Sequence, residues 1–143
     1  MKWWPLILLL WVIPAEGQSV YVQGVSYHWD TFHYEYNNIT PGVGIEVGEP
    51  VFVAFGAYRN SVRSLSNYAG VGYRRGWLWG GVVVATGYNR HRPDRRGNSP
   101  KGSMLVPIPL VGIDIPLTGR VSLRIMASAI VATTGLTVKF GKE

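Results

Sequence analysis

The feature that most constrains this chain is a recurring alternation, with period two, between aliphatic residues and small or polar ones. In "TPGVGIEVGEP" the aliphatic positions are Val43, Ile45 and Val47, and glycines and Glu46 occupy the positions between them. The segments "PVFVAFGAYRN", "GRVSLRIMASAI" and "GLTVKF" follow the same rule. A period of two is typical of β-strands, whose successive side chains point to opposite faces. The chain is therefore predicted to be all-β, with an aliphatic face opposite a small, polar and sometimes charged face.

Eight candidate strands can be marked on this basis. Their approximate ranges are 19–29, 42–48, 51–59, 67–75, 77–88, 103–114, 120–129 and 134–140. In a soluble barrel the aliphatic face would form the core. In an outer-membrane barrel the aliphatic face contacts lipid, and the small or polar face fills the lumen. The alternation alone does not distinguish these two cases.

The lengths of the connections favour the membrane barrel. Long segments such as "WDTFHYEYNNITP", "RNSVRSLS" and "NRHRPDRRGNSPK" alternate with the tight segments "GEP", "RRG" and "PLTG". Long external loops and short periplasmic turns are typical of transmembrane barrels. Aromatic residues also fall near the expected strand ends, as an interfacial girdle requires: Tyr27, Trp29, Tyr73, Trp77 and Tyr88. We predict an eight-stranded antiparallel transmembrane β-barrel, with a soluble lipocalin-like barrel as the main alternative.

The start of the chain resembles an export signal. Lys2 precedes the apolar run "WWPLILLLWVIP", and small residues follow at Ala15 and Gly17. This pattern is typical of a cleaved secretory signal peptide, although a membrane anchor has a similar apolar run. The domain organisation expected is a signal peptide over 1–17 and a barrel domain over 18–143. The expected location is the outer membrane of a Gram-negative cell, with the protein acting as a monomer.

The net charge of +6 is unevenly distributed. The segment "NRHRPDRRGNSPK" contains four arginines, Arg90, Arg92, Arg95 and Arg96, with a single aspartate. Such a cluster suits lipid phosphate groups, although a solvated loop has the same composition. Nucleic-acid binding is not expected, because the basic residues are confined to one loop of an exported chain. No cofactor and no metal site are predicted.

Two further features bear on function. If the first strand rises from the periplasm, His28 and Ser61 reach the same external end of the barrel, where an imidazole beside a hydroxyl is the minimum equipment for acyl chemistry. His33 and His91 are expected to be exposed. The segment "LVPIPLVGIDIP" carries Pro107 and Pro109 within an expected strand, where proline cannot donate to the ladder. We interpret these prolines as a place where the barrel wall opens.

Four segments resemble the lipid A palmitoyltransferases of the Gram-negative outer membrane, over roughly 25–115. "SYHWD" resembles the segment with the family's essential histidine, which corresponds to His28, and "NNITPGVGIEVG" places Pro41 before a glycine-rich strand. "YRNSVRSLSNYAGVGY" resembles a segment with an Asp-Ser pair, which corresponds to Asn60 and Ser61. "LVPIPLVGIDIP" resembles a Pro-x-Pro strand.

The resemblance implies transfer of a palmitoyl chain from a phospholipid to lipid A (lipopolysaccharide), with these two lipids as partners. It implies that His28 is the base, that Asn60 and Ser61 complete the catalytic site, and that lipid enters laterally beside Pro41, Pro107 and Pro109. The acyl chain would then occupy a lumen lined by small residues, namely Gly44, Ala54, Gly56 and Gly70. Asn60 stands where the family has aspartate, and an amide cannot carry the negative charge that stabilises an imidazolium. Two alternatives remain open: a lipid A deacylase, and a non-catalytic barrel that binds lipid or has a structural role.

Overall fold

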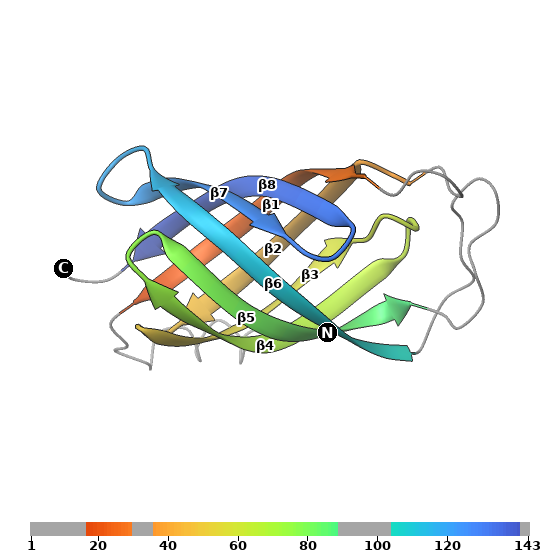
Figure 1. Ribbon diagram of the computed structural model, residues 1–143, viewed down its shortest axis with the longest axis horizontal. Coiled ribbons are helices and arrows are strands. Elements are labelled where there is room, and N and C mark those ends of the chain that lie inside the picture. Colours follow the sequence, from red (N-terminus) through yellow and green to blue (C-terminus); the bar gives the residue numbers. More distant parts are fainter. Residues whose placement is uncertain (1–16, 30–35, 89–103, 141–143) are drawn as a thin grey trace, which may run out of the picture.

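The computed structural model describes residues 17–29, 36–88 and 104–140, and these form one closed β-barrel (Figure 1). All eight expected strands are present, with ends displaced by no more than a few residues. They are β1 (Gln18–His28), β2 (Ile39–Val47), β3 (Val51–Arg59), β4 (Leu65–Arg75), β5 (Leu78–Tyr88), β6 (Met104–Pro116), β7 (Val121–Ala127) and β8 (Val131–Phe140). Each strand pairs antiparallel with its neighbours in the sequence, and β1 pairs with β8 to close the ring.

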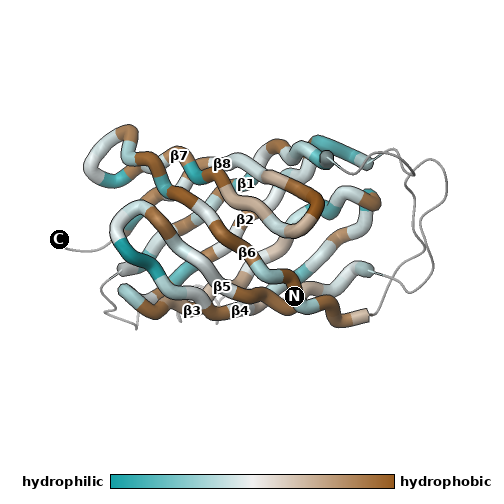
Figure 2. Tube along the Cα trace, in the orientation of Figure 1, coloured by the Kyte–Doolittle hydropathy of each residue, from teal (hydrophilic) through white to brown (hydrophobic). Residues whose placement is uncertain are grey.

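The aliphatic face of the sheet points outward. Val43, Phe55 and Leu136 are 54%, 44% and 45% exposed, whereas the neighbouring lumen-facing residues Glu46 and Thr137 are buried. Apolar residues therefore alternate with polar ones along the wall (Figure 2). This inverts the arrangement of a soluble barrel and is the arrangement of a transmembrane barrel. The prediction of the fold class is confirmed. No helix in the described part of the chain is long and apolar enough to cross a membrane.

The two ends of the barrel differ. At the tight-turn end, short connections over 48–50, 76–77 and 117–120 join the strands, and β1 begins there while β8 ends there. The connections at the opposite end, here called the long-loop end, cover 29–38, 60–64, 89–103 and 128–130. The second of these is shorter than predicted, because β4 already begins at Leu65. Only three residues separate β7 from β8. The connection between β7 and β8, for which no length was predicted, is thus the shortest at this end.

Most of the expected aromatic girdle is present. Tyr27, Trp29, Tyr73 and Trp77 lie near strand ends and are 48–67% exposed. The expectation for Tyr88 is wrong, because its side chain lines the internal cavity. The register between β5 and β6 shifts between Ala85 and Tyr88, and Gly87 adopts φ +85° at this bulge. One extra residue in a strand moves the following side chain to the other face.

The lumen is packed by large side chains that lie on glycines. A Cβ atom on Gly44 would lie within 3 Å of the Tyr68 ring, and one on Gly72 would collide with the Phe52 ring. Trp79 covers Gly112 in the same way. The small residues Gly44 and Gly56 were expected to line open space for an acyl chain. This expectation is wrong, because the phenol group of Tyr68 occupies the space above both glycines.

Candidate functional site

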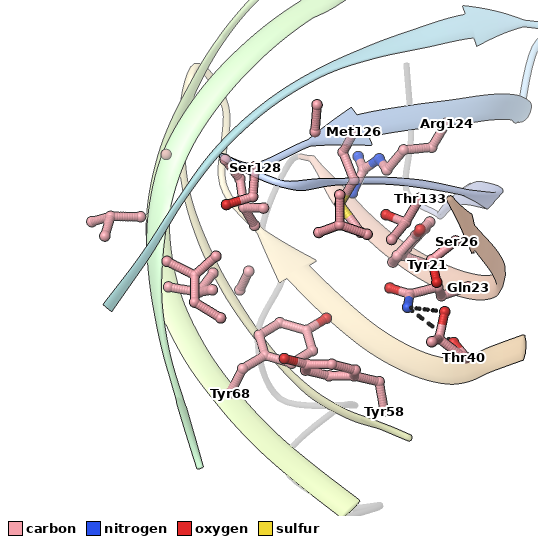
Figure 3. Close-up of a pocket in the computed structure, with 18 of the residues that line it drawn as sticks. Tyr21, Gln23, Ser26, Thr40, Tyr58, Tyr68, Arg124, Met126, Ser128 and Thr133 are labelled. Atoms are coloured by element: carbon pink, nitrogen blue, oxygen red, sulfur yellow. Dashed lines mark hydrogen bonds between the residues drawn. The ribbon is translucent and has the colours of Figure 1, made fainter. Parts of the chain in front are cut away.

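A cavity occupies the lumen from the middle of the barrel toward the long-loop end (Figure 3). About 960 Å³ in and around this cavity is free of protein atoms, a volume that includes open solvent. One wall is polar and comes from β8, β1 and β2; its residues are Gln23, Ser26, His28, Thr40 and Thr133. The facing wall is apolar and comes mainly from β5, β6 and β7; its residues include Val83, Ile108, Leu110, Met126 and Ala127. In a ring of eight strands β1 lies opposite β5, so the two walls face each other across the lumen.

His28 ends β1 at the long-loop end of this cavity. Its side chain is 3% exposed and stacks on the ring of Tyr36, with the centroids 4.3 Å apart. The imidazole Nδ1 lies 3.3 Å from the amide Oδ1 of Asn38. An amide oxygen only accepts hydrogen bonds, so Nδ1 must carry the proton, and Nε2 of the neutral ring keeps its lone pair. Asn38 thus holds His28 in the tautomer that a general base needs.

Ser61 lies in the connection between β3 and β4 and lines the same cavity as His28. Its carbonyl oxygen accepts a hydrogen bond of 2.9 Å from the Asn37 N–H, which ties this connection to the residues that hold His28. The sequence therefore correctly placed His28 and Ser61 at one end of the barrel. The contribution of Tyr36, Asn37 and Asn38 was missed, because no motif marks a loop that folds back over a strand end.

Asn60 is fully buried and does not line the cavity. Its Oδ1 accepts hydrogen bonds from the backbone N–H groups of Val62 (3.1 Å) and Ser64 (2.9 Å). Its Nδ2 donates to the Ser66 hydroxyl (3.0 Å) and to the Gly87 carbonyl oxygen (3.1 Å). All four hydrogen-bonding positions of the amide are thereby used. Asn60 organises the connection that presents Ser61, and its amide group is fully engaged in doing so.

Pro107 and Pro109 lie on β6 where its second partner is missing. Among the described residues, pairing of β6 with β7 begins at Val111 and Ala127, so the part of β6 over 104–110 pairs with β5 alone. The Asp114 N–H donates toward β5, to the Trp77 carbonyl oxygen. Backbone groups alternate in direction along a strand, so the odd-numbered positions face β7. Pro107 and Pro109 therefore lie at positions where a backbone N–H would point toward the unpaired edge of β6. Their lack of an N–H costs no hydrogen bond between β6 and β5.

Pro41 also lies at an irregularity. The register of β1 shifts at Gly24 against both β2 and β8, and Pro41 falls between the register partners Ile39 and Gly42. The side chain of Gln23 bridges this point, because its Nε2 donates to the carbonyl oxygen (2.9 Å) and to the hydroxyl (3.0 Å) of Thr40. The outer surface at Pro41 is exposed.

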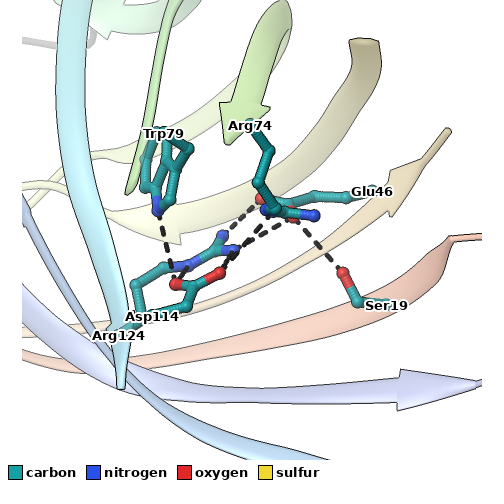
Figure 4. Close-up of polar contacts among 6 residues, drawn as sticks. All are labelled: Ser19, Glu46, Arg74, Trp79, Asp114 and Arg124. Carbon is teal, nitrogen blue, oxygen red and sulfur yellow. Dashed lines mark hydrogen bonds and ion pairs between the residues drawn. The ribbon is translucent and has the colours of Figure 1, made fainter. Parts of the chain in front are cut away.

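Four buried charged residues close the lumen toward the tight-turn end (Figure 4). Arg124, which is 1% exposed, donates to both carboxylates: to Glu46 through Nη1 and Nη2, and to Asp114 through Nε and Nη2. Arg74 donates to Glu46 over 2.7 Å and lies 3.6 Å from Asp114. We call these four residues the charge quartet. Its formal charges cancel, and Glu46 and Arg124 reach the floor of the cavity.

Several predicted features lie outside the described residues. They are the signal peptide, His33 and His91, and the proposed phosphate-binding residues Arg90, Arg92, Arg95 and Arg96. Within the described ranges, no group of three or more His, Asp or Glu side chains is placed to hold a metal ion.

Comparison with known proteins supports the fold alone. No protein-family model matches the chain, and no curated protein matches it either. Among solved structures it is similar to a de novo designed transmembrane β-barrel, with 21% sequence identity and a TM-score of 0.52. The match covers 87% of this chain and 95% of the designed one. This neighbour agrees with an eight-stranded transmembrane barrel and does not bear on the palmitoyltransferase resemblance.

Proposed function

We propose that this barrel is an outer-membrane acyltransferase, which moves an acyl chain from a phospholipid to lipid A. The observation that carries the proposal is the position of His28. Its Nε2 has no hydrogen-bond partner among the described residues, and His28 lines a cavity that Ser61 and an apolar wall also line. A base, a hydroxyl and a surface suited to an alkyl chain thus border one cavity.

The reaction needs one proton transfer and one exchange of ester bonds. His28 Nε2 takes the proton from a lipid A hydroxyl, and the resulting oxygen nucleophile attacks the ester carbonyl of the phospholipid. The bond between the acyl carbon and the glycerol oxygen then breaks, and the imidazolium returns the proton to that oxygen. The Ser61 hydroxyl is suited to donate a hydrogen bond to the carbonyl oxygen as negative charge develops on it. In this proposal Asn60 acts by positioning Ser61.

We infer that lipid enters the barrel laterally, through the part of the wall where β6 lacks its second partner. The unpaired part of β6 borders the apolar side of the cavity, where Ile108 and Leu110 point inward. Pro107 and Pro109 remove two N–H donors that would otherwise be unsatisfied within the bilayer. A lipid chain can enter such an edge without breaking a hydrogen bond. The shifted register beside Pro41 is the second candidate entrance.

The first test is mass spectrometry of lipid A from Gram-negative cells that make the protein, its His28→Ala variant or neither. We expect a gain of one acyl chain with the parent protein and no gain with His28→Ala. Ser61→Ala should reduce the product, and Ser61→Thr, which keeps a hydroxyl, should restore part of it. Slower migration of boiled than unboiled samples on a gel checks that each variant forms the barrel.

Two other outcomes have defined meanings. Loss of an acyl chain from lipid A would identify a deacylase, in which the same base activates water in place of a lipid hydroxyl. Unchanged lipid A in cells with the folded protein in the outer membrane would contradict catalysis and favour a barrel that only binds lipid or has a structural role.

A further inference from the structure

We propose that the cavity selects an acyl chain that carries a hydroxyl group near its carboxyl end. This inference rests on the proposed function, because it specifies which chain the lumen accepts. It comes from the chemistry of the polar wall, which a plain saturated chain does not match.

The polar wall contains hydroxyl groups that lack a hydrogen-bond partner. Ser26 Oγ has no hydrogen-bond partner among the described residues. The Thr133 hydroxyl and the Tyr21 phenol lie close enough to interact with each other, but neither makes a hydrogen bond of good geometry with a described residue. Ser26 is 7% exposed and Tyr21 is 4% exposed, and all three residues line the cavity. Figure 3 shows these side chains grouped on one side of the cavity. A buried polar group without a partner is costly, so this wall is suited to a ligand that supplies one.

The position of these hydroxyls indicates which carbons of the acyl chain should carry the hydroxyl group. Ser26 and Thr133 are register partners, as are His28 and Val131 two residues further along each strand. Two residues span about 7 Å along a strand, or roughly 5 Å along the axis of a barrel whose strands are tilted by about 40°. With the ester carbonyl at His28, a substituent on one of the first few carbons reaches the level of Ser26.

The apolar wall on the opposite side of the cavity is suited to the rest of the acyl chain. Val83, Leu110 and Met126 present alkyl and thioether groups to the cavity, and the unpaired part of β6 lies beside them. An alkyl chain can pack along this side while its hydroxyl faces Ser26 and Thr133. A ligand polar on one side near its head, and apolar beyond, matches both walls.

The test uses the folded full barrel and two probes of equal length, hexadecanoate and 3-hydroxyhexadecanoate. The chain has methionine at positions 104 and 126 beyond the initiator, and only Met126 lines the cavity. In a protein labelled with ¹³C at the methionine methyl groups, both probes should shift the Met126 signal and leave that of Met104 unchanged. We expect the hydroxylated probe to bind about fivefold to tenfold more tightly, as one or two net hydrogen bonds would give.

The double variant Ser26→Ala/Thr133→Val should remove this preference. Thr137→Val is the matched control, because Thr137 has a buried hydroxyl without a partner but does not line the cavity. Equal affinity for the two probes in the parent protein would overturn the inference and leave the proposed function standing. A preference that survives in the double variant would also overturn it. If neither probe shifts Met126, the lumen takes no acyl chain, and the proposed function fails as well.

Discussion

At the scale of single residues, the site depends on amide side chains that a motif search passes over. Asn38 is the partner that fixes the tautomer of His28, over 3.3 Å. In Asn38→Ala the imidazole loses this acceptor, and its proton is free to move to Nε2. We expect ¹⁵N NMR of the folded variant to show a mixture of tautomers, with lower acyl transfer, whereas Asn38→Asp keeps an acceptor and the parent tautomer. An unchanged tautomer in Asn38→Ala would show that Asn38 does not orient the ring.

Asn60 gives the second prediction at this scale. An aspartate in its place would direct a carboxylate oxygen at the Gly87 carbonyl oxygen, where the Nδ2 of Asn60 now donates over 3.1 Å. Two acceptors would then face each other in a buried position, which costs about 1–3 kcal/mol. We expect Asn60→Asp to lower the free energy of unfolding in urea by this amount. A variant as stable as the parent and more active would instead identify Asn60 as a replaced catalytic aspartate.

Individual residues also show how far the positions of side chains could be predicted from the sequence. The alternation correctly assigned lumen-facing and lipid-facing positions on the strands, because the period of two is carried by the residues themselves. It misplaced Tyr88, since a bulge at Gly87 with φ +85° reverses the faces and leaves no trace in the alternation. It also treated the glycines as open space, because the pairing of Tyr68 with Gly44 and Gly56 depends on register across three strands.

At the scale of elements, the notable strand is β6, because its part over 104–110 pairs with β5 alone. Its prolines sit at odd positions facing the unpaired edge, while its even positions donate to β5. Pro109→Ala should therefore change the urea midpoint little, because no ladder bond depends on that position. Ile108→Pro should lower it strongly or prevent folding, since it removes a donor to β5 in a bilayer that offers no replacement. Similar midpoints for the two variants would contradict the assigned direction of the β6 backbone.

The interrupted edge of β6 was in part predictable. Two prolines in one expected strand indicated a break in pairing, and the break is there. Which neighbour is lost could not be known, because that depends on the early end of β7 at Ala127 and the short hairpin that follows it.

At the scale of the whole molecule, the charge quartet joins the four strands β2, β4, β6 and β7. Glu46 and Arg124 are separated by 78 positions, so only closure of the barrel brings them together. The sequence placed both on lumen-facing positions but gave no means of pairing them. The quartet is neutral only as a set, which makes the barrel sensitive to the loss of any single member.

This sensitivity can be measured. Arg124→Met leaves Glu46 and Asp114 with Arg74 alone, and an uncompensated buried charge costs about 3–5 kcal/mol. Asp114→Asn in the same chain restores neutrality, because Glu46 keeps its 2.7 Å ion pair with Arg74. We expect the double variant Arg124→Met/Asp114→Asn to unfold in urea at a higher concentration than Arg124→Met alone. Strict additivity of the two single effects would show that each ion pair acts separately. Recovery in the double variant would show that the lumen requires balanced charge more than any one contact, as expected where interacting residues share one network.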